Sequence, residues 1–230
     1  MKPTTSLPFS AQQDQWYEQA RARLNPRRLK QLLFDISNIH SPTGATRQAS
    51  EFMSRHLQGI GMKSRYYPMS DITGNVVGER RGSGGGATVL LYAPIDTHLD
   101  RTPGEEMLTG EGQEADLQPF AQMVDDWVFG LGSSNPKAMI ATLTEVATAL
   151  IEAEVPLRGD LLLGMADGGM PVDISARHAG MSNGVIHLLN RGMYPDFAII
   201  MKPWNWVYHE EPGMAWFKLK VYGTDRKSVV

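Results

Sequence analysis

Hydrophobic and polar positions follow two different periods along the chain, which predicts a succession of helices and strands. Residues 11–39 carry apolar side chains at helical spacing, and Asn25 and Pro26 interrupt the pattern. We therefore predict two helices there, the second beginning at the proline. A third helix is predicted between Thr46, a candidate N-cap, and Gly61, a residue type that often ends helices.

Further segments have the spacing of strands: residues 63–68, 75–80, 87–95, 127–129, 161–165, 197–201 and 214–222. Helices are predicted from Pro136 to about residue 153 and over residues 184–190. The runs 87–95 and 161–165 are continuously apolar, as is typical of strands that are covered on both faces in a parallel sheet. We therefore predict an α/β fold in which a mixed, mainly parallel sheet is sandwiched by helices.

Of three polar or glycine-rich stretches, the first two are not expected to form binding sites. The basic residues of the first two predicted helices are Arg21, Arg23, Arg27, Arg28 and Lys30. Glu18 and Asp35 flank them, so we expect a solvated helix face and not a binding patch. The glycine tract at residues 82–86 precedes a strand and lacks the Lys-Ser/Thr of a phosphate loop. Residues 101–126, with seven acids and one arginine, are expected to form an exposed loop that borders the site.

Composition narrows the class of protein. With 230 residues, 42% of them hydrophobic, the chain can bury one sizeable core. Its 22 basic and 25 acidic residues give a net charge of −3, so no nucleic-acid partner is expected. Without cysteine there is no disulfide, thiolate ligand or cysteine nucleophile. The sequence shows neither a signal-peptide pattern nor a run near the ~20 apolar residues of a membrane span, so we expect a soluble cytoplasmic protein with no membrane partner.

Ligands of open α/β sheets bind beyond the carboxyl ends of the strands. The residues that directly follow the apolar runs are therefore the candidates for a functional site. The four segments at such ends are residues 92–97, 130–137, 165–169 and 200–204. Polar residues among them are Asp96, Asn135, Lys137, Asp167 and Lys202. We expect these five side chains to meet at the mouth of one sheet.

Several short motifs occur in a recognisable order: Ser41-Pro42-Thr43-Gly44, Gly74-Asn75-Val76, Gly159-Asp160-Leu161 and residues 195–200. In order and spacing, residues 27–224 resemble the zinc-dependent aminoacylase and carboxypeptidase family that includes acetylornithine deacetylase and succinyl-diaminopimelate desuccinylase. The resemblance implies a peptidase-like catalytic domain over residues 1–213 and the first strand of a lid or dimerisation domain over 214–224. Residues 225–230 match one reading frame of a common sequencing adapter. We therefore expect a non-native tail and a native chain that continues beyond residue 224, with the full-length protein a homodimer.

The resemblance implies hydrolysis of C–N amide bonds in small N-acyl amino acids or peptides by a dinuclear zinc site. The family builds that site from a His-x-Asp pair, a bridging Asp, a Glu-Glu pair and an acid before a proline. Here the ligand positions read Pro94, Asn135, Gly168-Gly169 and Lys202, while Asp96 and Asp167 are retained. The residues that would hold zinc and generate its hydroxide are therefore missing, and we expect no cofactor.

One shift of register would restore part of the site. His98-Leu99-Asp100 is a literal His-x-Asp three residues downstream, and zinc would be expected if this pair supplies the ligands. The shift leaves the other substitutions unchanged. His178, His187 and His209 lack the spacing of an alternative zinc site.

Two interpretations of the remaining residues stay open. In both, the Lys202 ammonium replaces the charge of the lost metal and pairs with Asp96. In a catalytic form, Lys202 polarises a substrate carbonyl with Asp96 or Asp167 as base, and Asn135 and Lys137 bind the amide or carboxylate substrate. In the form that we favour, a salt bridge fills a retired site. The function is then either that of a hydrolase homologue or that of a non-catalytic protein that binds a small carboxylate or a partner subunit.

Overall fold

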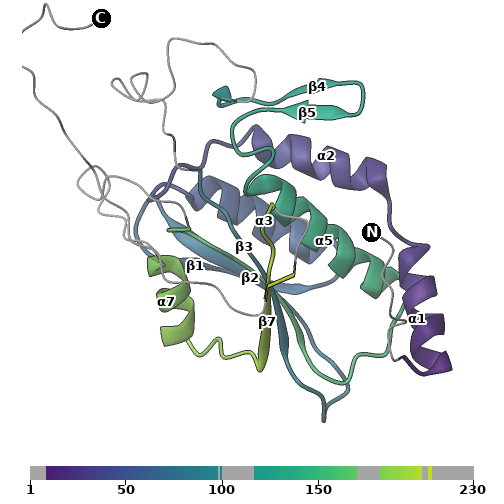
Figure 1. The fold of residues 1–230 in the computed structure, drawn as a ribbon. Coiled ribbons are helices and arrows are strands. Elements are labelled where there is room, and N and C mark those ends of the chain that lie inside the picture. The colour runs from purple at the N-terminus through teal and green to yellow at the C-terminus, as the bar shows by residue number, and fades with distance from the viewer. Residues whose placement is uncertain (1–8, 98, 100–116, 170–181, 204–206, 209–230) are drawn as a thin grey trace, which may run out of the picture.

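The computed structural model describes residues 9–97, 99, 117–169, 182–203 and 207–208. Its helices are α1 (Ala11–Arg21), α2 (Pro26–Ser37), α3 (Arg47–Gly59), α5 (Lys137–Glu152) and α7 (Asn183–Asn190). Its strands are β1 (Lys63–Pro68), β2 (Gly74–Arg80), β3 (Val89–Pro94), β4 (Gln122–Val124), β5 (Trp127–Phe129), β6 (Leu161–Ala166) and β7 (Phe197–Ile200). Helices α2, α3 and α5 cover one face of the central sheet and α7 lies on the other (Figure 1). The predicted helices and strands within the described residues are confirmed, with small shifts at their ends.

The central sheet has five strands in the order β1-β2-β6-β3-β7. Strand β3 pairs in parallel with both β6 and β7, whereas β2 is antiparallel to β6 and to β1. Four of the strands therefore run in one direction and β2 runs against them. This arrangement confirms the mixed, mainly parallel sheet, and it places the ends of β3, β6 and β7 at one edge.

The local sequence explains where the first helices begin. Asn25 caps α2, since its side-chain oxygen accepts hydrogen bonds from the backbone N–H groups of Arg27 and Arg28, and Pro26 occupies the first turn as predicted. Thr46 does precede α3, but its side chain makes no capping bond. Its hydroxyl instead bonds to the Thr73 hydroxyl and the Gly74 carbonyl, so the predicted cap is tied to β2.

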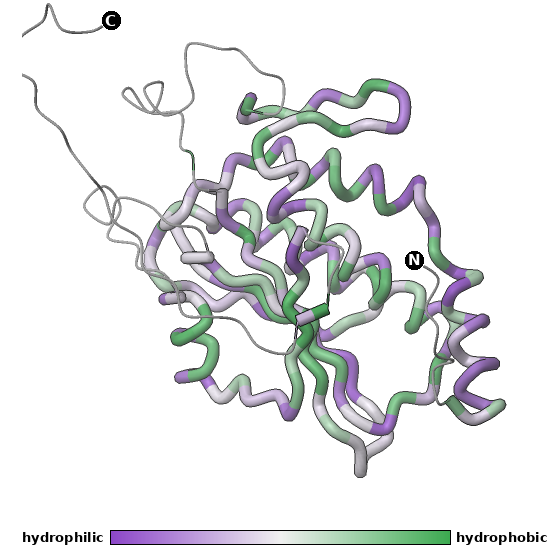
Figure 2. Tube along the Cα trace, in the orientation of Figure 1, coloured by the Kyte–Doolittle hydropathy of each residue, from purple (hydrophilic) through white to green (hydrophobic). Residues whose placement is uncertain are grey.

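The hydrophobic core is unequal on the two faces of the sheet. On the face of α2, α3 and α5 the buried residues include Ile36, Met53, Leu57, Val76, Leu91, Ile140, Leu163 and Met165. On the other face the buried cluster is Val77, Leu162, Ala166 and Leu188, the last from α7. Figure 2 shows the most hydrophobic positions along the central strands and their covering helices. No helix in the described part of the chain is both long and apolar enough to cross a membrane.

The end of the acidic segment is not a loop, which corrects the prediction for residues 101–126. Strand β4 pairs with β5 as an antiparallel hairpin whose turn is Asp125-Asp126. Both acids are exposed, and Asp126 forms an ion pair with Lys30 of α2 at 2.9 Å. The sequence analysis missed β4 because the strand has only three residues and lies next to Asp125 and Asp126. Residues 101–116 of that segment, and the predicted strand 214–222, lie outside the described residues.

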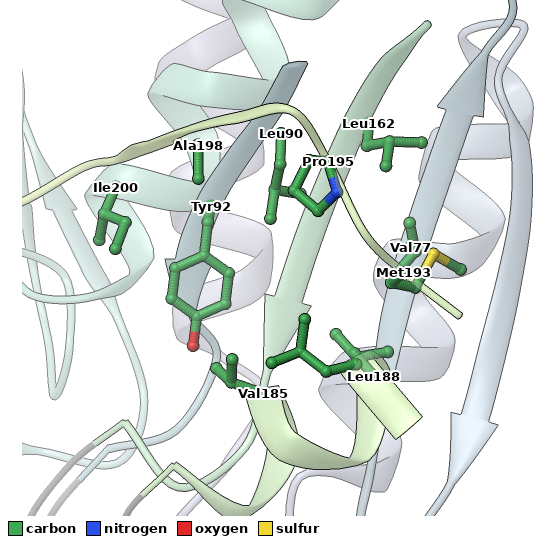
Figure 3. A pocket seen from close by; sticks show the side chains of 11 residues that line it. Val77, Leu90, Tyr92, Leu162, Val185, Leu188, Met193, Pro195, Ala198 and Ile200 are labelled. Atoms are coloured by element: carbon green, nitrogen blue, oxygen red, sulfur yellow. The ribbon is translucent and has the colours of Figure 1, made fainter. Parts of the chain in front are cut away.

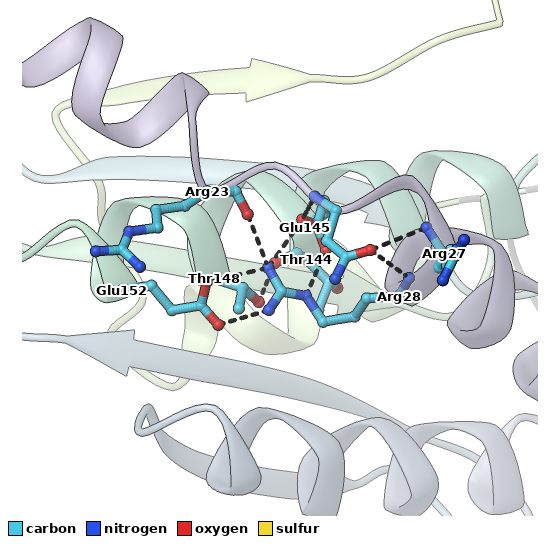
Figure 4. A network of polar contacts seen from close by, with 8 residues as sticks. Arg23, Arg27, Arg28, Thr144, Glu145, Thr148 and Glu152 are labelled. Carbon is cyan, nitrogen blue, oxygen red and sulfur yellow. Dashed lines mark hydrogen bonds and ion pairs between the residues drawn. The ribbon is translucent and has the colours of Figure 1, made fainter.

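The environment of Arg28 contradicts the prediction that the basic residues of the first two helices form a solvated face. Its Nε and Nη2 atoms donate to the two carboxylate oxygens of Glu145 in α5 at 2.8 and 2.9 Å, and it also pairs with Glu152 (Figure 4). The Glu145 side chain is only 4% exposed, and it accepts a further bond from the Asn25 N–H. The hydrogen bonds that Arg28 donates to Glu145 raise the pKa of Arg28 above its usual value. Because the partner lies 117 residues away, helix-local charge spacing could not reveal this link between α2 and α5.

Candidate functional site

The turn before α3 is fixed against the end of β3. The Thr43 N–H donates to the Thr97 carbonyl at 3.0 Å, and the Thr97 N–H donates to the Ser41 carbonyl at 2.9 Å. Pro42 and Thr97 thereby form an isolated parallel bridge. This turn, which the sequence motif Ser41-Pro42-Thr43-Gly44 marks, brings hydroxyl and N–H donors to the carboxyl edge of the sheet.

Asp96 follows β3 and is completely buried. Its Oδ2 accepts a hydrogen bond of 2.6 Å from the Thr43 hydroxyl, and its Oδ1 accepts one of 3.0 Å from the Gly169 N–H. Asp96 therefore connects the turn before α3 to the end of β6. Both of these donors are neutral groups.

Asp167 follows β6 and is 3% exposed. The Gly44 N–H donates to both of its oxygens, at 3.0 and 3.1 Å, and the Thr73 hydroxyl donates to Oδ2 at 2.8 Å. Its backbone N–H donates to the Asn75 side-chain oxygen at 2.9 Å. These donors are neutral, like the two donors to Asp96 named above, and the turn residues Thr43 and Gly44 each bind one of the two acids.

Asn75 and His187 extend this cluster, and site prediction from the sequence missed both. Asn75 is buried, and its side-chain N–H2 donates to the Gly184 carbonyl and lies 3.2 Å from Nδ1 of His187. As the amide nitrogen only donates, Nδ1 accepts, and the proton of the neutral imidazole is on Nε2. Burial lowers the pKa of His187, which agrees with a neutral ring. The Gly74-Asn75-Val76 motif was the only sequence signal for this part of the cluster.

The hydroxyl of Tyr92 is affected by the negative charge of Asp96 and Asp167. Burial raises the pKa of its hydroxyl far above the usual value, and the nearby Asp96 and Asp167 carboxylates raise it further. Two retained acids thus lie close enough to one side chain of β3 to repel a third negative charge.

Pro94 and Gly169, at two positions where the sequence resemblance implies metal ligands, are in direct contact. A Cβ atom placed on Gly169 would lie 2.2 Å from Cβ and 2.8 Å from Cγ of Pro94. Gly168 has a φ of +79°, in the left-handed region that favours glycine. A Glu-Glu pair therefore does not fit here unless Pro94 changes and the backbone at residue 168 adapts.

The other two predicted binding residues have different environments. Lys137 begins α5, is 2% exposed, and its ammonium donates to the Ile39 carbonyl at 2.8 Å. Burial lowers the pKa of Lys137 to about 8. Asn135 is exposed, in the turn that leads into α5. Their roles as substrate-binding residues stay predictions, although the burial of Lys137 fits a structural role.

Lys202 follows β7 and is exposed, unlike Asp96 and Asp167. Its pairing with Asp96, and the catalytic roles of Asp96, Asp167 and Lys202, stay predictions. His98 and Asp100, the alternative register for a zinc ligand pair, lie outside the described residues, as do His178 and His209.

The described donor set does not fit a dinuclear zinc site. Among these residues, no group of three or more His, Asp or Glu side chains is arranged to hold a metal ion. Pro94 and Gly169 offer no side-chain ligand at their two positions. The two remaining carboxylates already accept hydrogen bonds from Thr43, Gly169, Gly44 and Thr73.

No model of a known protein family matches the chain. Solved structures do match it. A tripeptidase from Staphylococcus aureus is 16% identical, with a TM-score of 0.56 over 77% of this chain and 43% of that one. Human carnosine dipeptidase 1 is also 16% identical, with a TM-score of 0.59 over 84% and 41%. An M20 family metallo-carboxypeptidase from Sulfolobus solfataricus is 15% identical, with a TM-score of 0.52 over 73% and 36%.

These likenesses confirm the fold that the sequence resemblance implied: the described chain has the α/β architecture of the catalytic part of these peptidases. The matched region spans less than half the length of each of the three.

Proposed function

We propose that this chain is a non-hydrolytic relative of the metallopeptidases, which binds a partner through the shared fold and does not cleave a C–N bond. The observation that carries the proposal is the contact between Pro94 and Gly169. At these two positions, where the resemblance implies a histidine ligand and a Glu of the Glu-Glu pair, the proline ring fills the space beside Gly169, and neither residue offers a ligand or a carboxylate base. The fold alone does not assign an activity, because function depends on the residues of the site.

The hydrogen bonds of Asp96 and Asp167 support the same conclusion. Each carboxylate ties the turn before α3 to a strand end, with Gly169 as a second donor to Asp96 and Thr73 as a second donor to Asp167. In this role the acids stabilise the edge of the sheet. A buried carboxylate needs such donors, so retention of both acids does not require a metal.

Metal analysis combined with an activity assay tests the proposal. The purified chain is incubated with zinc, desalted and analysed by elemental mass spectrometry, and we expect fewer than about 0.1 tightly bound ions per chain. Hydrolysis of N-acetyl amino acids and of dipeptides is then measured with added zinc. Human carnosine dipeptidase 1, assayed in parallel, shows that the dipeptide assay works. No hydrolysis above the buffer blank is expected from this chain.

Near-stoichiometric zinc together with hydrolysis would overturn the proposal. The variant His98→Ala then identifies the ligands. If it abolishes both zinc binding and hydrolysis, the shifted register His98-Leu99-Asp100 supplies the site and the chain is a hydrolase.

A further inference from the structure

A polar groove lies on the α7 face of the sheet, near the amino ends of β3 and β6 and away from the site around Asp96 and Asp167. It has a volume of about 440 Å³, which is within the range of small-molecule sites. Strands β1, β2 and β6 contribute its floor, and the segment between α7 and β7 contributes a wall. The lining residues with polar side chains are Lys63, Ser64, Arg65, Tyr67, Glu79, Thr88, Asp160 and Tyr194.

The middle of this groove is apolar. Val77, Leu162 and Met193 line it, and the same three residues line the neighbouring apolar pocket that Figure 3 shows. Val77 and Leu162 belong to the buried cluster that packs against Leu188 of α7. The groove therefore offers an apolar surface to the middle of a ligand and charged groups to its ends, a combination that is typical of small-molecule sites.

One end of the groove carries two cations. Lys63 and Arg65 are exposed, and because they are two residues apart on β1 their side chains stand on the same face. Lys63 lies opposite Glu79 in the register of β1 and β2, but the Glu79 carboxylate accepts its hydrogen bond from Arg81. The Arg65 guanidinium lies 5.9 Å from the ring centroid of Tyr67, a contact that orients the cation and leaves its charge in place. Within the described part of the chain, neither Lys63 nor Arg65 forms an ion pair.

The other end carries the carboxylate of Asp160, directly before β6. Its Oδ1 accepts a hydrogen bond of 2.9 Å from the Gly82 N–H, and among the described residues no donor reaches its Oδ2. Strand β2 separates Asp160 from Lys63, so their backbones are two strand spacings, roughly 10 Å, apart. A ligand that contacts both ends would meet positive charge at β1 and negative charge at the start of β6.

We propose that this groove binds a small zwitterion, whose carboxylate lies at Lys63 and Arg65, whose ammonium lies at Asp160 and whose methylene chain lies on the apolar floor. Charge complementarity selects this class, since a simple anion leaves Asp160 without a partner and a simple cation leaves both basic residues without one. The polypeptide backbone is uncharged, so a further segment of this chain would match the groove only through its side chains. The inference goes beyond the proposed function, because the groove shares no residue with the cluster around Asp96 and Asp167.

Isothermal titration calorimetry of the full chain at pH 7 compares three probes. 6-Aminohexanoate carries both charges, hexanoate lacks the ammonium group and hexylamine lacks the carboxylate. We expect 6-aminohexanoate to bind with a Kd of about 1 mM or lower. Each single-charge probe should bind at least about tenfold more weakly, because it loses one charge-assisted contact.

Three variants assign the two ends of the groove. Lys63→Met and Arg65→Met should each weaken the binding of 6-aminohexanoate by about fivefold or more. Asp160→Asn keeps a side-chain oxygen for the Gly82 N–H and removes the charge, so 6-aminohexanoate and hexanoate should bind this variant alike. Arg55→Met is the matched control, since Arg55 is exposed on α3, on the opposite face of the sheet (Figure 1). It should bind like the wild type, and circular dichroism checks that all variants are folded.

Several results would overturn the proposal. Equal binding of 6-aminohexanoate and hexanoate by the wild type would make the ligand a simple anion, and equal binding of all three probes would show apolar contact alone. Unchanged binding by Lys63→Met and Arg65→Met would place the ligand elsewhere. No binding of 6-aminohexanoate, which would also result if a segment of the chain itself fills the groove, overturns the proposal as well. Since the readout involves neither zinc nor hydrolysis, its failure is distinct from failure of the non-hydrolytic assignment.

Discussion

The contact between Pro94 and Gly169 predicts that even a methyl group at residue 169 destabilises the protein. Gly169→Ala would bring the new Cβ to 2.2 Å from Cβ of Pro94, more than 1 Å inside the roughly 3.5 Å of a favourable carbon contact. Pro94 cannot move away easily, because it belongs to β3 and pairs with Ala166 of β6. The φ angle of Gly169 lies outside the left-handed region, so the cost comes from packing and not from backbone strain.

The magnitude follows from the cost of overpacking. Inserting a methyl group into a well-packed site costs about 1–3 kcal/mol, and the rigid neighbour places Gly169→Ala toward the upper end, at about 2–3 kcal/mol. In a chain of this size that corresponds to a melting temperature lower by about 4–12 °C. Pro94→Gly removes the obstructing ring, so in that background Gly169→Ala should cost less than about 0.5 kcal/mol. The coupling free energy of the double-mutant cycle is then about 2 kcal/mol.

Urea unfolding followed by circular dichroism measures all four members of the cycle. Gly59→Ala is the matched control, since Gly59 ends α3 and has no atom within 4 Å of an added Cβ. It should be neutral or stabilise the protein by up to about 1 kcal/mol. The steric reasoning is refuted if Gly169→Ala lies within about 0.5 kcal/mol of the wild type, or if Pro94→Gly gives no relief.

Three further predictions concern the metal site, the helix interface and a buried base. Gly169→Glu, alone or combined with Pro94→His, should gain no zinc affinity in isothermal titration calorimetry, because a histidine at residue 94 keeps the Cβ atom that would lie 2.2 Å from a Cβ at residue 169; measurable zinc binding by either variant would contradict this. Arg28→Met should lower the free energy of unfolding by about 3 kcal/mol because it leaves a buried carboxylate unpaired, while Arg47→Met, which breaks an exposed pair, should cost less than about 1 kcal/mol in the same urea assay. Burial lowers the pKa of Lys137 from 10.5 to about 8, so the unfolded chain binds more protons between these values and wild-type stability should gain up to about 3 kcal/mol as the pH rises through this window. Lys137→Met should lack this gain in urea unfolding at pH 7 to 10, and equal slopes for the two proteins would refute the assignment.

Much of the architecture is local and could be predicted. Asn25 and Pro26 start α2 through a side-chain cap and a fixed φ angle, which depend on neighbouring residues only. The continuous apolar runs that became β3 and β6 indicated strands covered on both faces, and the two strands do pair in parallel. Short elements such as β4 were not predicted, because three residues beside an acidic turn are too few to show the periodicity of a strand.

The candidate site was predicted as a set of positions and not as a set of contacts. The strand-end rule selected Asp96 and Asp167, and both lie at the carboxyl edge of the sheet. Nothing in the sequence indicated that Thr43 and Gly169 bind the first acid, or that Thr73 binds the second, since each of these pairs is separated by at least 53 residues. The sequence analysis placed Arg28 on a solvated face for the same reason, because its buried partner in α5 is 117 residues away along the chain.

The sequence by itself determined the order of helices and strands, the mixed α/β class and the residue type at each position where the resemblance implies a metal ligand. These properties depend on periodicity, on capping and on residue type, all of which can be read within a few turns of the chain. Only the tertiary structure decided that the Pro94 ring occupies the space beside Gly169, and that Thr43 and Gly169 donate hydrogen bonds to Asp96 while Gly44 and Thr73 donate to Asp167. The physical reason is that strand order and register bring distant residues within a few ångströms, and at that range packing and hydrogen bonding decide what a site can do.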